Sequence, residues 1–199
     1  SGVAAITSAP LAFASSGGHL LVADSVYGPT RAFCDRMLGR FNVSTTYYDP
    51  RIGAGIAALI RPDTKLIFLE APGSLTFEMQ DIPAILAAAK RAKIVTIMDN
   101  TWATPLFFRP LEHGVDISMH SATKYIAGHS DLMMGVLTAD LGVFPKLRSA
   151  IELLGCCAAP DDCYLALRGL RTLGARLPRH QETGLILARW LQARPEVAD

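Results

Sequence analysis

The sequence lacks several features that would assign it to a class at once. No apolar run reaches the roughly 18 residues that a membrane span requires, and the first residues carry no basic segment typical of a secretory signal. The net charge is only +1, from 19 basic and 18 acidic residues, so no excess of charge favours nucleic acid or an anionic membrane surface. We therefore expect a cytoplasmic protein with neither a nucleic-acid nor a membrane partner.

Cysteine is also scarce. Of the four cysteines, Cys156 and Cys157 are adjacent, and no CxxC spacing or histidine pair at metal-ligand spacing accompanies them. This pattern favours reduced, structural cysteines and no metal site, with a reactive or oxidised thiol near Cys156 as the alternative. No GxGxxG motif follows the first apolar segment, which disfavours a dinucleotide-binding sheet.

Apolar segments that alternate with helical patterns are abundant. The chain has 199 residues, half of them hydrophobic, which suffices for one well-filled core. Nearly continuous apolar strands separated by helices predict an α/β fold, a mostly parallel sheet sandwiched by helices. The expected strands are residues 19–25, 43–49, 65–72, 94–100, 116–119 and 132–140.

The expected helices follow from capping and periodicity. Asp81 is a candidate N-cap with Pro83 in the first turn behind it, and a helix is also expected to start at residues 1–3. Pro178 is expected to separate the last two helices, because proline removes a helical hydrogen bond. The other expected helices are residues 29–41, 52–61, 81–93, 144–154, 161–177 and 179–191.

Polar side chains gather where the expected strands end. Ligands of parallel α/β sheets bind at the carboxyl ends of the strands, so these side chains form one candidate site. One strand ends in the segment 70–74, which starts with a glutamate and contains Ser74. The candidate site residues are Gly2 and Val3 at the first helix start, Tyr27 after the first strand, Asp99, Ser121, Thr123 and Lys124.

These residue types suit pyridoxal phosphate (PLP). Helix N-terminal N–H groups and hydroxyls bind phosphate, and a partly desolvated lysine can attack a carbonyl as a free amine. A carboxylate such as Asp99 can keep a ring nitrogen protonated, so that the ring withdraws electrons. The chain has five lysines, and only Lys124 follows a buried strand among small residues. From spacing alone, Lys124 can also be a solvated lysine, Asp99 a turn cap and Tyr27 a packing residue.

Other polar residues nearby have simpler interpretations. His120 is expected in or near the core, and His129 and Asp131 are expected to hold the turn after the lysine. Arg168 and Arg171 are expected to be structural or to lie at a subunit contact.

Four segments carry a resemblance to a known family. In chain order, "DSVYGPTR", "IMDNTWATPLFF", "SATKYIAGHSD" and "LRGLRTLGARLPRH" resemble the Cys/Met-metabolism PLP-dependent enzymes. The resemblance covers essentially the whole chain, and "SATKYIAGHSD" with an upstream "DN" is a specific pattern. It implies the large domain of the fold-type-I, aminotransferase-like PLP enzymes.

The resemblance also implies roles for the candidate site residues. Lys124 resembles the lysine that forms the Schiff base and moves protons, and Asp99 resembles the partner of the pyridine nitrogen. Tyr27 resembles the tyrosine that stacks on the cofactor ring and assists proton transfer. The implied phosphate ligands are Gly2 and Val3 through backbone N–H groups, and Ser121 and Thr123 through hydroxyls.

Within the family, the segment "LEAPGSLTFEMQDIPAI" resembles the cystathionine β-lyase branch. The γ-enzymes typically carry an Asn-Pro pair shortly after the same proline, and this pair is absent here. The implied reaction is β-elimination of the thioether amino acid cystathionine to homocysteine, pyruvate and ammonia in methionine biosynthesis. The alternatives are a cystathionine γ-synthase, γ-lyase or methionine γ-lyase activity, or a catalytically silent fragment.

The sequence differs from the family in which segments it contains. Family members carry an N-terminal arm with a Tyr-x-Arg pair and a C-terminal domain whose arginine grips the substrate carboxylate, and neither is in this sequence. Residues 1–199 are therefore expected to be the central PLP-binding domain of a homo-oligomer, a dimer or a tetramer.

Overall fold

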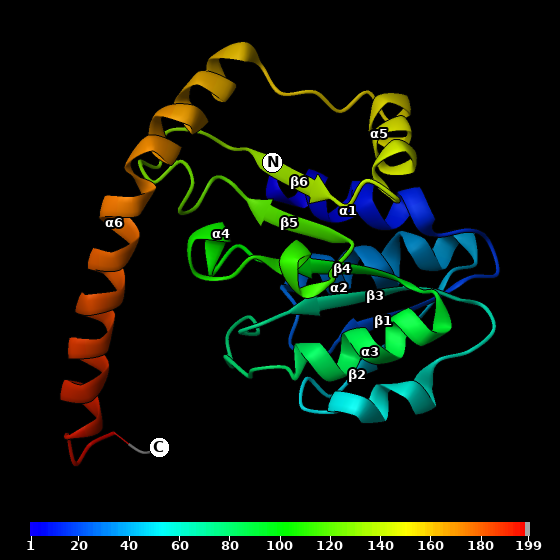
Figure 1. Ribbon diagram of the computed structural model, residues 1–199, viewed down its shortest axis with the longest axis horizontal. Helices are drawn as coiled ribbons and strands as arrows, with labels where there is room; N and C mark the ends of the chain where they lie inside the picture. Colours follow the sequence, from blue (N-terminus) through cyan, green and yellow to red (C-terminus); the bar gives the residue numbers. More distant parts are fainter. Residues whose placement is uncertain (198–199) are drawn as a thin grey trace.

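In the computed structural model, which describes residues 1–197, the strands form one six-stranded sheet of order β2-β1-β3-β4-β5-β6 (Figure 1). Strands β1 to β5 are parallel, and β6 is antiparallel to β5. This arrangement confirms the mostly parallel sheet. The strands are β1 (His19–Ala23), β2 (Ser44–Tyr48), β3 (Thr64–Glu70), β4 (Val95–Asp99), β5 (Ile117–Ser121) and β6 (Gly135–Ala139).

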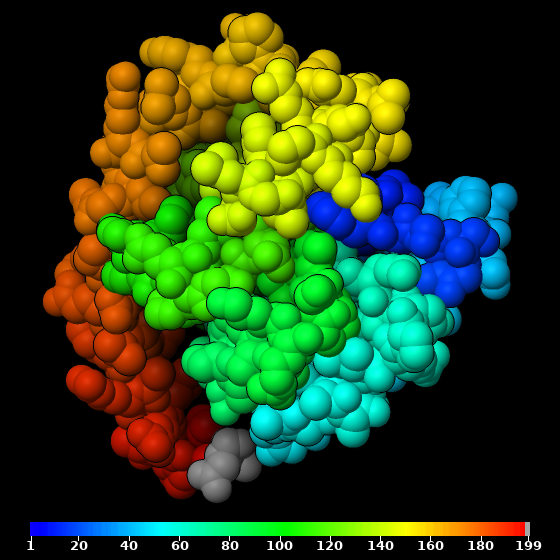
Figure 2. All heavy atoms as spheres, turned by 45° about the vertical axis from the view of Figure 1, so that its right-hand side comes forward, coloured from blue at the N-terminus to red at the C-terminus, as the bar shows by residue number. Residues whose placement is uncertain are grey.

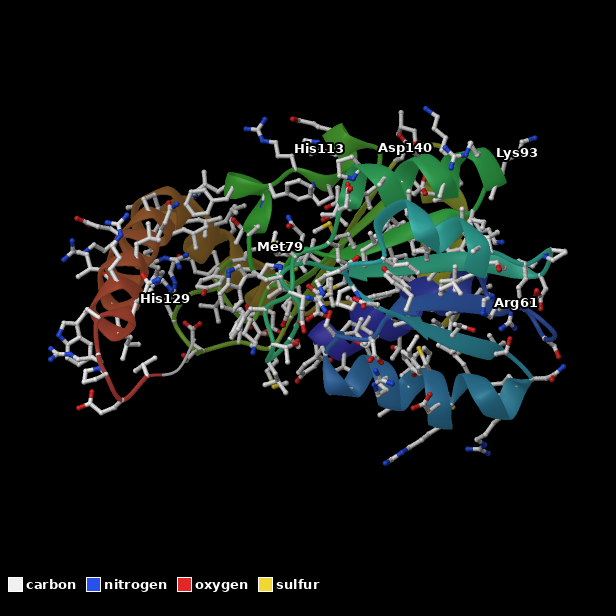
Figure 3. All side chains as sticks on the ribbon, turned by 90° about the horizontal axis from the view of Figure 1, so that it is seen from below. Arg61, Met79, Lys93, His113, His129 and Asp140 are labelled. Atoms are coloured by element: carbon white, nitrogen blue, oxygen red, sulfur yellow. The ribbon has the colours of Figure 1, made fainter. Side chains whose placement is uncertain are left out.

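Helices cover both faces of the sheet. The helix α1 contacts β5, β6 and α5, and α3 packs with the short helix η2 on the opposite face (Figures 1 and 3). The α-helices are α1 (Gly2–Phe13), α2 (Gly28–Arg36), α3 (Ile82–Ala92), α4 (Thr104–Phe107), α5 (Phe144–Leu153) and α6 (Pro160–Gln192). The 3₁₀ helices are η1 (Leu38–Phe41), η2 (Gly53–Leu59) and η3 (Pro110–His113).

The core lies between these layers. Every residue of β1 is buried, and the central strands contribute Phe68 and Ile97, which are almost completely inaccessible. Burial of one such large apolar side chain contributes about 1.5–3 kcal/mol. The near-continuous apolar runs of the sequence therefore correspond to strands covered on both faces.

The expected cap of α3 is confirmed. The Asp81 carboxylate accepts a hydrogen bond from the Ala84 N–H at 3.1 Å, and Lys93 ends the helix in the left-handed conformation. Such a cap satisfies one of the free N–H groups at the helix start. The helix expected at residues 29–41 is instead divided into α2 and η1, and Asn42 in the left-handed conformation ends η1.

The expected break at Pro178 is wrong. Helix α6 continues through this proline from Pro160 to Gln192, although proline leaves the carbonyl four residues earlier, that of Gly174, without its helical donor. Both Gly174 and Pro178 are exposed, so water can replace the missing donor. The helix stands beyond the tips of the parallel strands, and its second half forms one edge of the molecule (Figures 1 and 2).

Among the described residues, no helix is both long and apolar enough to cross a bilayer.

Candidate functional site

The start of α1 presents free backbone donors at the end of β5. The Ser1 hydroxyl accepts the Ala4 N–H at 3.2 Å, which leaves the N–H groups of Gly2 and Val3 without an acceptor in residues 1–197. A Cβ atom on Gly2 would lie only 2.5 Å from the Ser121 hydroxyl oxygen. The helix start therefore lies directly against Ser121.

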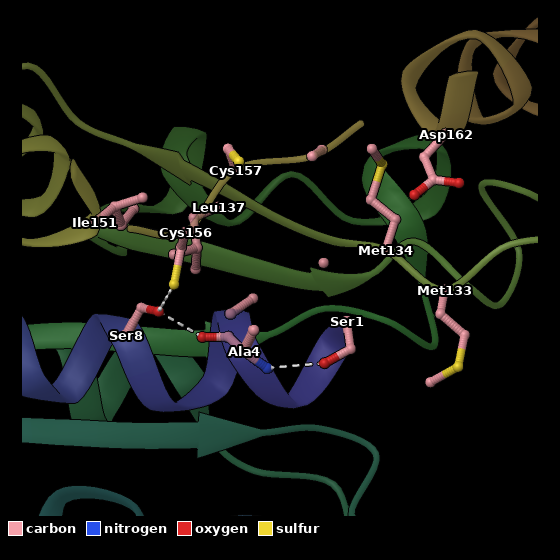
Figure 4. Close-up of a pocket in the computed structure, with 13 residues that line it drawn as sticks. Ser1, Ala4, Ser8, Met133, Met134, Leu137, Ile151, Cys156, Cys157 and Asp162 are labelled. Atoms are coloured by element: carbon pink, nitrogen blue, oxygen red, sulfur yellow. Dashed lines mark hydrogen bonds between the residues drawn. The ribbon is translucent and has the colours of Figure 1, made fainter. Parts of the chain in front are cut away.

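A cavity of about 240 Å³ flanks the first turns of α1, but it is not this site (Figure 4). It is lined by Ser8, Met134 and Cys156 among others, and by none of the predicted site residues. Ser8 and Cys156 contact each other there, with 3.8 Å between hydroxyl oxygen and sulfur. All four cysteines are free thiols.

The hydroxyls of Ser121, at the end of β5, and of Thr123, just after it, differ in whether they are free to bind a ligand. The Ser121 N–H donates to the Thr101 hydroxyl at 2.8 Å, while the Ser121 hydroxyl has no hydrogen-bond partner in the described part of the chain. The Thr123 hydroxyl accepts the Met134 N–H at 2.9 Å and donates to the Met134 carbonyl at 3.2 Å. Ser121 can therefore donate a hydrogen bond to a ligand, whereas the proton of Thr123 is already engaged.

Asp99 and Lys124 influence each other electrostatically. Asp99 is buried at the end of β4, and its carboxylate accepts the Thr101 N–H at 2.9 Å. Burial raises the pKa of the Asp99 carboxyl, while the hydrogen bonds from Thr101 and the positive charge of Lys124 oppose this effect. The Lys124 side chain is exposed. The structure thus places a buried acid and an exposed lysine at the ends of the neighbouring strands β4 and β5.

Glu70 lies at the same sheet edge, and the sequence interpretation noted it at a strand end but gave it no role. It pairs with Asp99 in the β3–β4 register, its carboxylate accepts the Tyr27 N–H at 2.9 Å, and the Ser74 hydroxyl donates to it at 2.5 Å. Burial and, secondarily, the Asp99 charge raise the pKa of Glu70 to about 7. An acid at the end of a buried strand was the available sequence signal.

The hydrogen bond to the Glu70 carboxylate fixes the backbone of Tyr27, while the Tyr27 ring stays accessible. Tyr27 lies at the N-terminus of α2, and the residue is 43% exposed. A fixed backbone with an open aromatic face is suitable for stacking against a planar ligand.

Replacing Glu70 with glutamine tests the raised pKa. Between pH 4.5, the ordinary value, and about 7, the unfolded chain loses the Glu70 proton while the folded chain keeps it. Wild-type stability should therefore fall across this window by on the order of 3 kcal/mol relative to Glu70→Gln, which does not titrate. Urea unfolding of both proteins at pH 4.5 and pH 7.5 measures this change.

The comparison with Glu70→Gln also cancels the contributions of other titrating groups to the pH dependence of stability. Burial lowers the pKa of His120 to about 4, so His120 gives the opposite slope, equally in both proteins. A stability difference between the two proteins that stays the same at both pH values would contradict the raised pKa of Glu70.

His120, His129 and Asp131 lie as the sequence predicts. His120 is buried, although its Nε2 atom has no hydrogen-bond partner in the part of the chain that the structure describes. The His129 ring bonds the Ala127 carbonyl at 2.6 Å, and Arg168 forms an ion pair with Asp131. These contacts hold the turn after Lys124. In residues 1–197, no three His, Cys, Asp or Glu side chains are grouped to bind a metal ion.

A model of one family, described as the Cys/Met metabolism PLP-dependent enzymes, matches residues 1–199. The chain belongs to this family. Relatives that carry a cystathionine β-lyase name are 39% to 58% identical to it. A protein of Rhizobium johnstonii provisionally named so is 58% identical over 198 residues, 100% of this chain and 50% of its own length. The chain thus spans about half the length of such relatives.

Two further relatives show the range within these PLP-dependent enzymes. An L-alanine/L-glutamate racemase of Wolbachia pipientis is 45% identical over 99% of this chain and 48% of its own length. The crystal structure of cystathionine γ-lyase from Lactobacillus plantarum, complexed with L-serine, superposes with a TM-score of 0.96 at 35% identity. It covers 100% of this chain and 52% of the other. The fold is therefore that of the fold-type-I PLP-dependent enzymes.

The residues at the sheet edge fit the cofactor of this family. Within the described residues, the first two N–H groups of α1 and the Ser121 hydroxyl have no partner, so they can donate to a phosphate. Asp99 and Lys124 lie at the ends of neighbouring strands and supply a carboxylate that can accept from a protonated pyridine nitrogen and an amine that can attack an aldehyde. These groups come from α1, β4 and β5, which meet only in the folded chain.

Proposed function

We propose that the protein cleaves a carbon–sulfur bond by β-elimination, and that its substrate is cystathionine. Cystathionine and one water would give homocysteine, pyruvate and ammonia. The observation that carries this proposal is that Asp99 ends β4 and Lys124 follows the neighbouring strand β5, at the edge where α1 meets Ser121. The β-lyase names of relatives and the Pro-Gly-Ser segment at residues 72–74 favour β-elimination over γ-elimination.

Each proposed role follows from the position of the side chain. Lys124 would hold the cofactor through its Nζ atom, Asp99 would keep the ring nitrogen protonated, and Tyr27 would stack on the ring. The phosphate would accept hydrogen bonds from the first two N–H groups of α1 and from the hydroxyls of Ser121 and Thr123, with Thr123 reoriented from Met134. The bound cofactor would supply an electron sink for charge that develops at the substrate Cα.

The protein's own groups would move the protons. The Lys124 amine, once released, would take the Cα proton of the substrate and donate a proton to the departing sulfur. Tyr27, whose ring is accessible, would assist this transfer. Asp99 would remain an anion beside the ring nitrogen, because that positive charge would compensate for its burial.

The products distinguish the candidate reactions. We expect that cystathionine with added PLP yields pyruvate in a coupled reductase assay. Production of 2-oxobutyrate would overturn β-elimination in favour of a γ-enzyme. A chain that binds PLP but forms neither product would be the catalytically silent fragment, and epimerised alanine would indicate a racemase.

We also propose a cytoplasmic homo-oligomer, dimeric or tetrameric, without nucleic-acid partners. The second half of α6 supports association, because no residue from 178 to 192 is buried and several are large and apolar. These are Leu185, Ile186, Leu187, Trp190 and Leu191. Sedimentation as a monomer at micromolar concentration would contradict the oligomer.

A further inference from the structure

We infer that Arg176 on α6 is a positioning residue for Lys124, acting as a clamp on the backbone of the turn that follows this lysine. The role of Lys124 in this inference rests on the proposed function. The clamp itself rests on the hydrogen bonds that Arg176 makes to the turn. Arg176 and the turn are about 50 residues apart in sequence, and α6 stands directly beside the carboxyl ends of the strands (Figure 1).

The Arg176 guanidinium binds backbone carbonyls. Its Nη2 atom donates to the carbonyl oxygen of Tyr125 at 2.9 Å and to that of Ile126 at 3.3 Å. The same nitrogen lies 2.8 Å from the Gly169 carbonyl, and Nε donates to the Thr172 hydroxyl at 2.9 Å. The side chain is thereby fixed to its own helix while it holds the turn.

No carboxylate is within ion-pair distance of Arg176 in residues 1–197. The guanidinium is therefore not used for an ion pair. The guanidinium has separate nitrogens in one plane, so Nη2 binds the carbonyls of the turn while Nε donates to Thr172, which the single ammonium of lysine cannot do with the same geometry. This use explains why an arginine stands at this position.

The turn is shaped to receive this side chain. Gly128 has φ of +71°, and a Cβ atom there would lie 2.2 Å from the Arg176 guanidinium. On the helix, a Cβ on Gly169 would lie 2.2 Å from the Ala127 carbonyl oxygen. Two glycines therefore permit the close approach, and the Tyr125 ring adds a contact with His180, at 5.8 Å between ring centres.

The clamp reaches Lys124 through the backbone. The Lys124 N–H donates to the Ser121 carbonyl at 3.0 Å, and its carbonyl accepts the Gly128 N–H at 2.8 Å. The sheet thus holds the turn on one side of the lysine, and Arg176 holds it on the other.

The experiment compares Arg176→Gln and Arg176→Lys with Arg179→Gln, a matched control on the same helix. Arg179 is exposed and forms an ion pair with Glu182 on its own helix. In the cofactor-free protein, loss of the clamp should speed hydrogen exchange at the Ala127 and Gly128 amides by about tenfold or more. Arg176→Lys should give a smaller increase, and the control none.

A second measurement links the clamp to the lysine. The pH midpoint of the absorbance band that PLP forms with the protein should shift in both Arg176 variants and not in Arg179→Gln, because a loosened turn changes the surroundings of Lys124. Wild-type exchange and an unchanged midpoint in Arg176→Lys and Arg176→Gln would overturn the inference. If Arg176→Gln fails to fold, Arg176→Lys decides.

The two proposals can fail separately. If the wild-type protein forms no band with PLP, the proposed function fails, while hydrogen exchange still tests the clamp. If the band forms but exchange and midpoint are unaffected by the Arg176 variants, the clamp fails and the proposed function stands.

Discussion

Replacing Lys124 with arginine is expected to abolish the PLP absorbance band near the edge of the visible range. Arginine keeps the positive charge near Asp99 but stays protonated, so it has no free amine to attack a carbonyl. Proton transfer at Cα is lost as well, and elimination should fall roughly 10²–10⁴-fold from that step alone. Because the Lys124 side chain is exposed, unfolding free energy should change by less than about 0.5 kcal/mol.

Absorbance titration with PLP and a pyruvate assay measure these effects. Lys90→Arg is the matched control, since Lys90 is exposed on α3, away from the site residues. A variant at Lys124 that keeps the absorbance band would show that another amine holds the cofactor, and the assignment of Lys124 would be wrong. Loss of the band in Lys90→Arg as well would point to a general effect of the substitution.

Replacing Gly169 with alanine is expected to be the most destabilising single-methyl change on α6. The added Cβ would lie 2.2 Å from the Ala127 carbonyl oxygen and 2.3 Å from that of Ile126. Both are backbone atoms that cannot rotate away, so the helix must move off the turn. Overpacking of this kind costs about 1–3 kcal/mol, and we expect the upper end because two backbone oxygens are involved.

The same helix supplies the control. Gly174 is exposed, and a Cβ there meets nothing within 4 Å. Gly174→Ala should therefore stabilise the protein by about 0.5–1 kcal/mol through higher helix propensity and lower entropy of the unfolded chain. Urea unfolding of both variants checks the opposite signs. Equal effects would show that α6 does not pack on the turn as closely as the structure has it.

Much of the fold could be predicted from local patterns. The alternation of apolar strands with helices predicted a mostly parallel sheet, and Asp81 predicted the start of α3. The prediction failed at Pro178, because local propensity disfavours proline in a helix regardless of its surroundings. Whether the helix continues depends on whether water can reach the Gly174 carbonyl, and this is a property of the folded surface.

The candidate site divides in the same way. Strand ends in the sequence located Asp99 and Lys124, since parallel strands bring their carboxyl ends to one edge. Glu70 ends its strand too, but its importance depends on two hydrogen bonds and on the register with Asp99. A charged residue at a strand end is common, and only its burial and partners show which one is part of a site.

The sequence by itself determined the class of fold and the family, because these follow from periodicity and from motifs of residues close together in the chain. Only the tertiary structure decided that α1 meets Ser121, that Glu70 borders Asp99 and that Arg176 holds the turn after Lys124. Those contacts join segments separated by tens of residues. Packing selects them, and no local pattern encodes which distant carbonyl an arginine will bind.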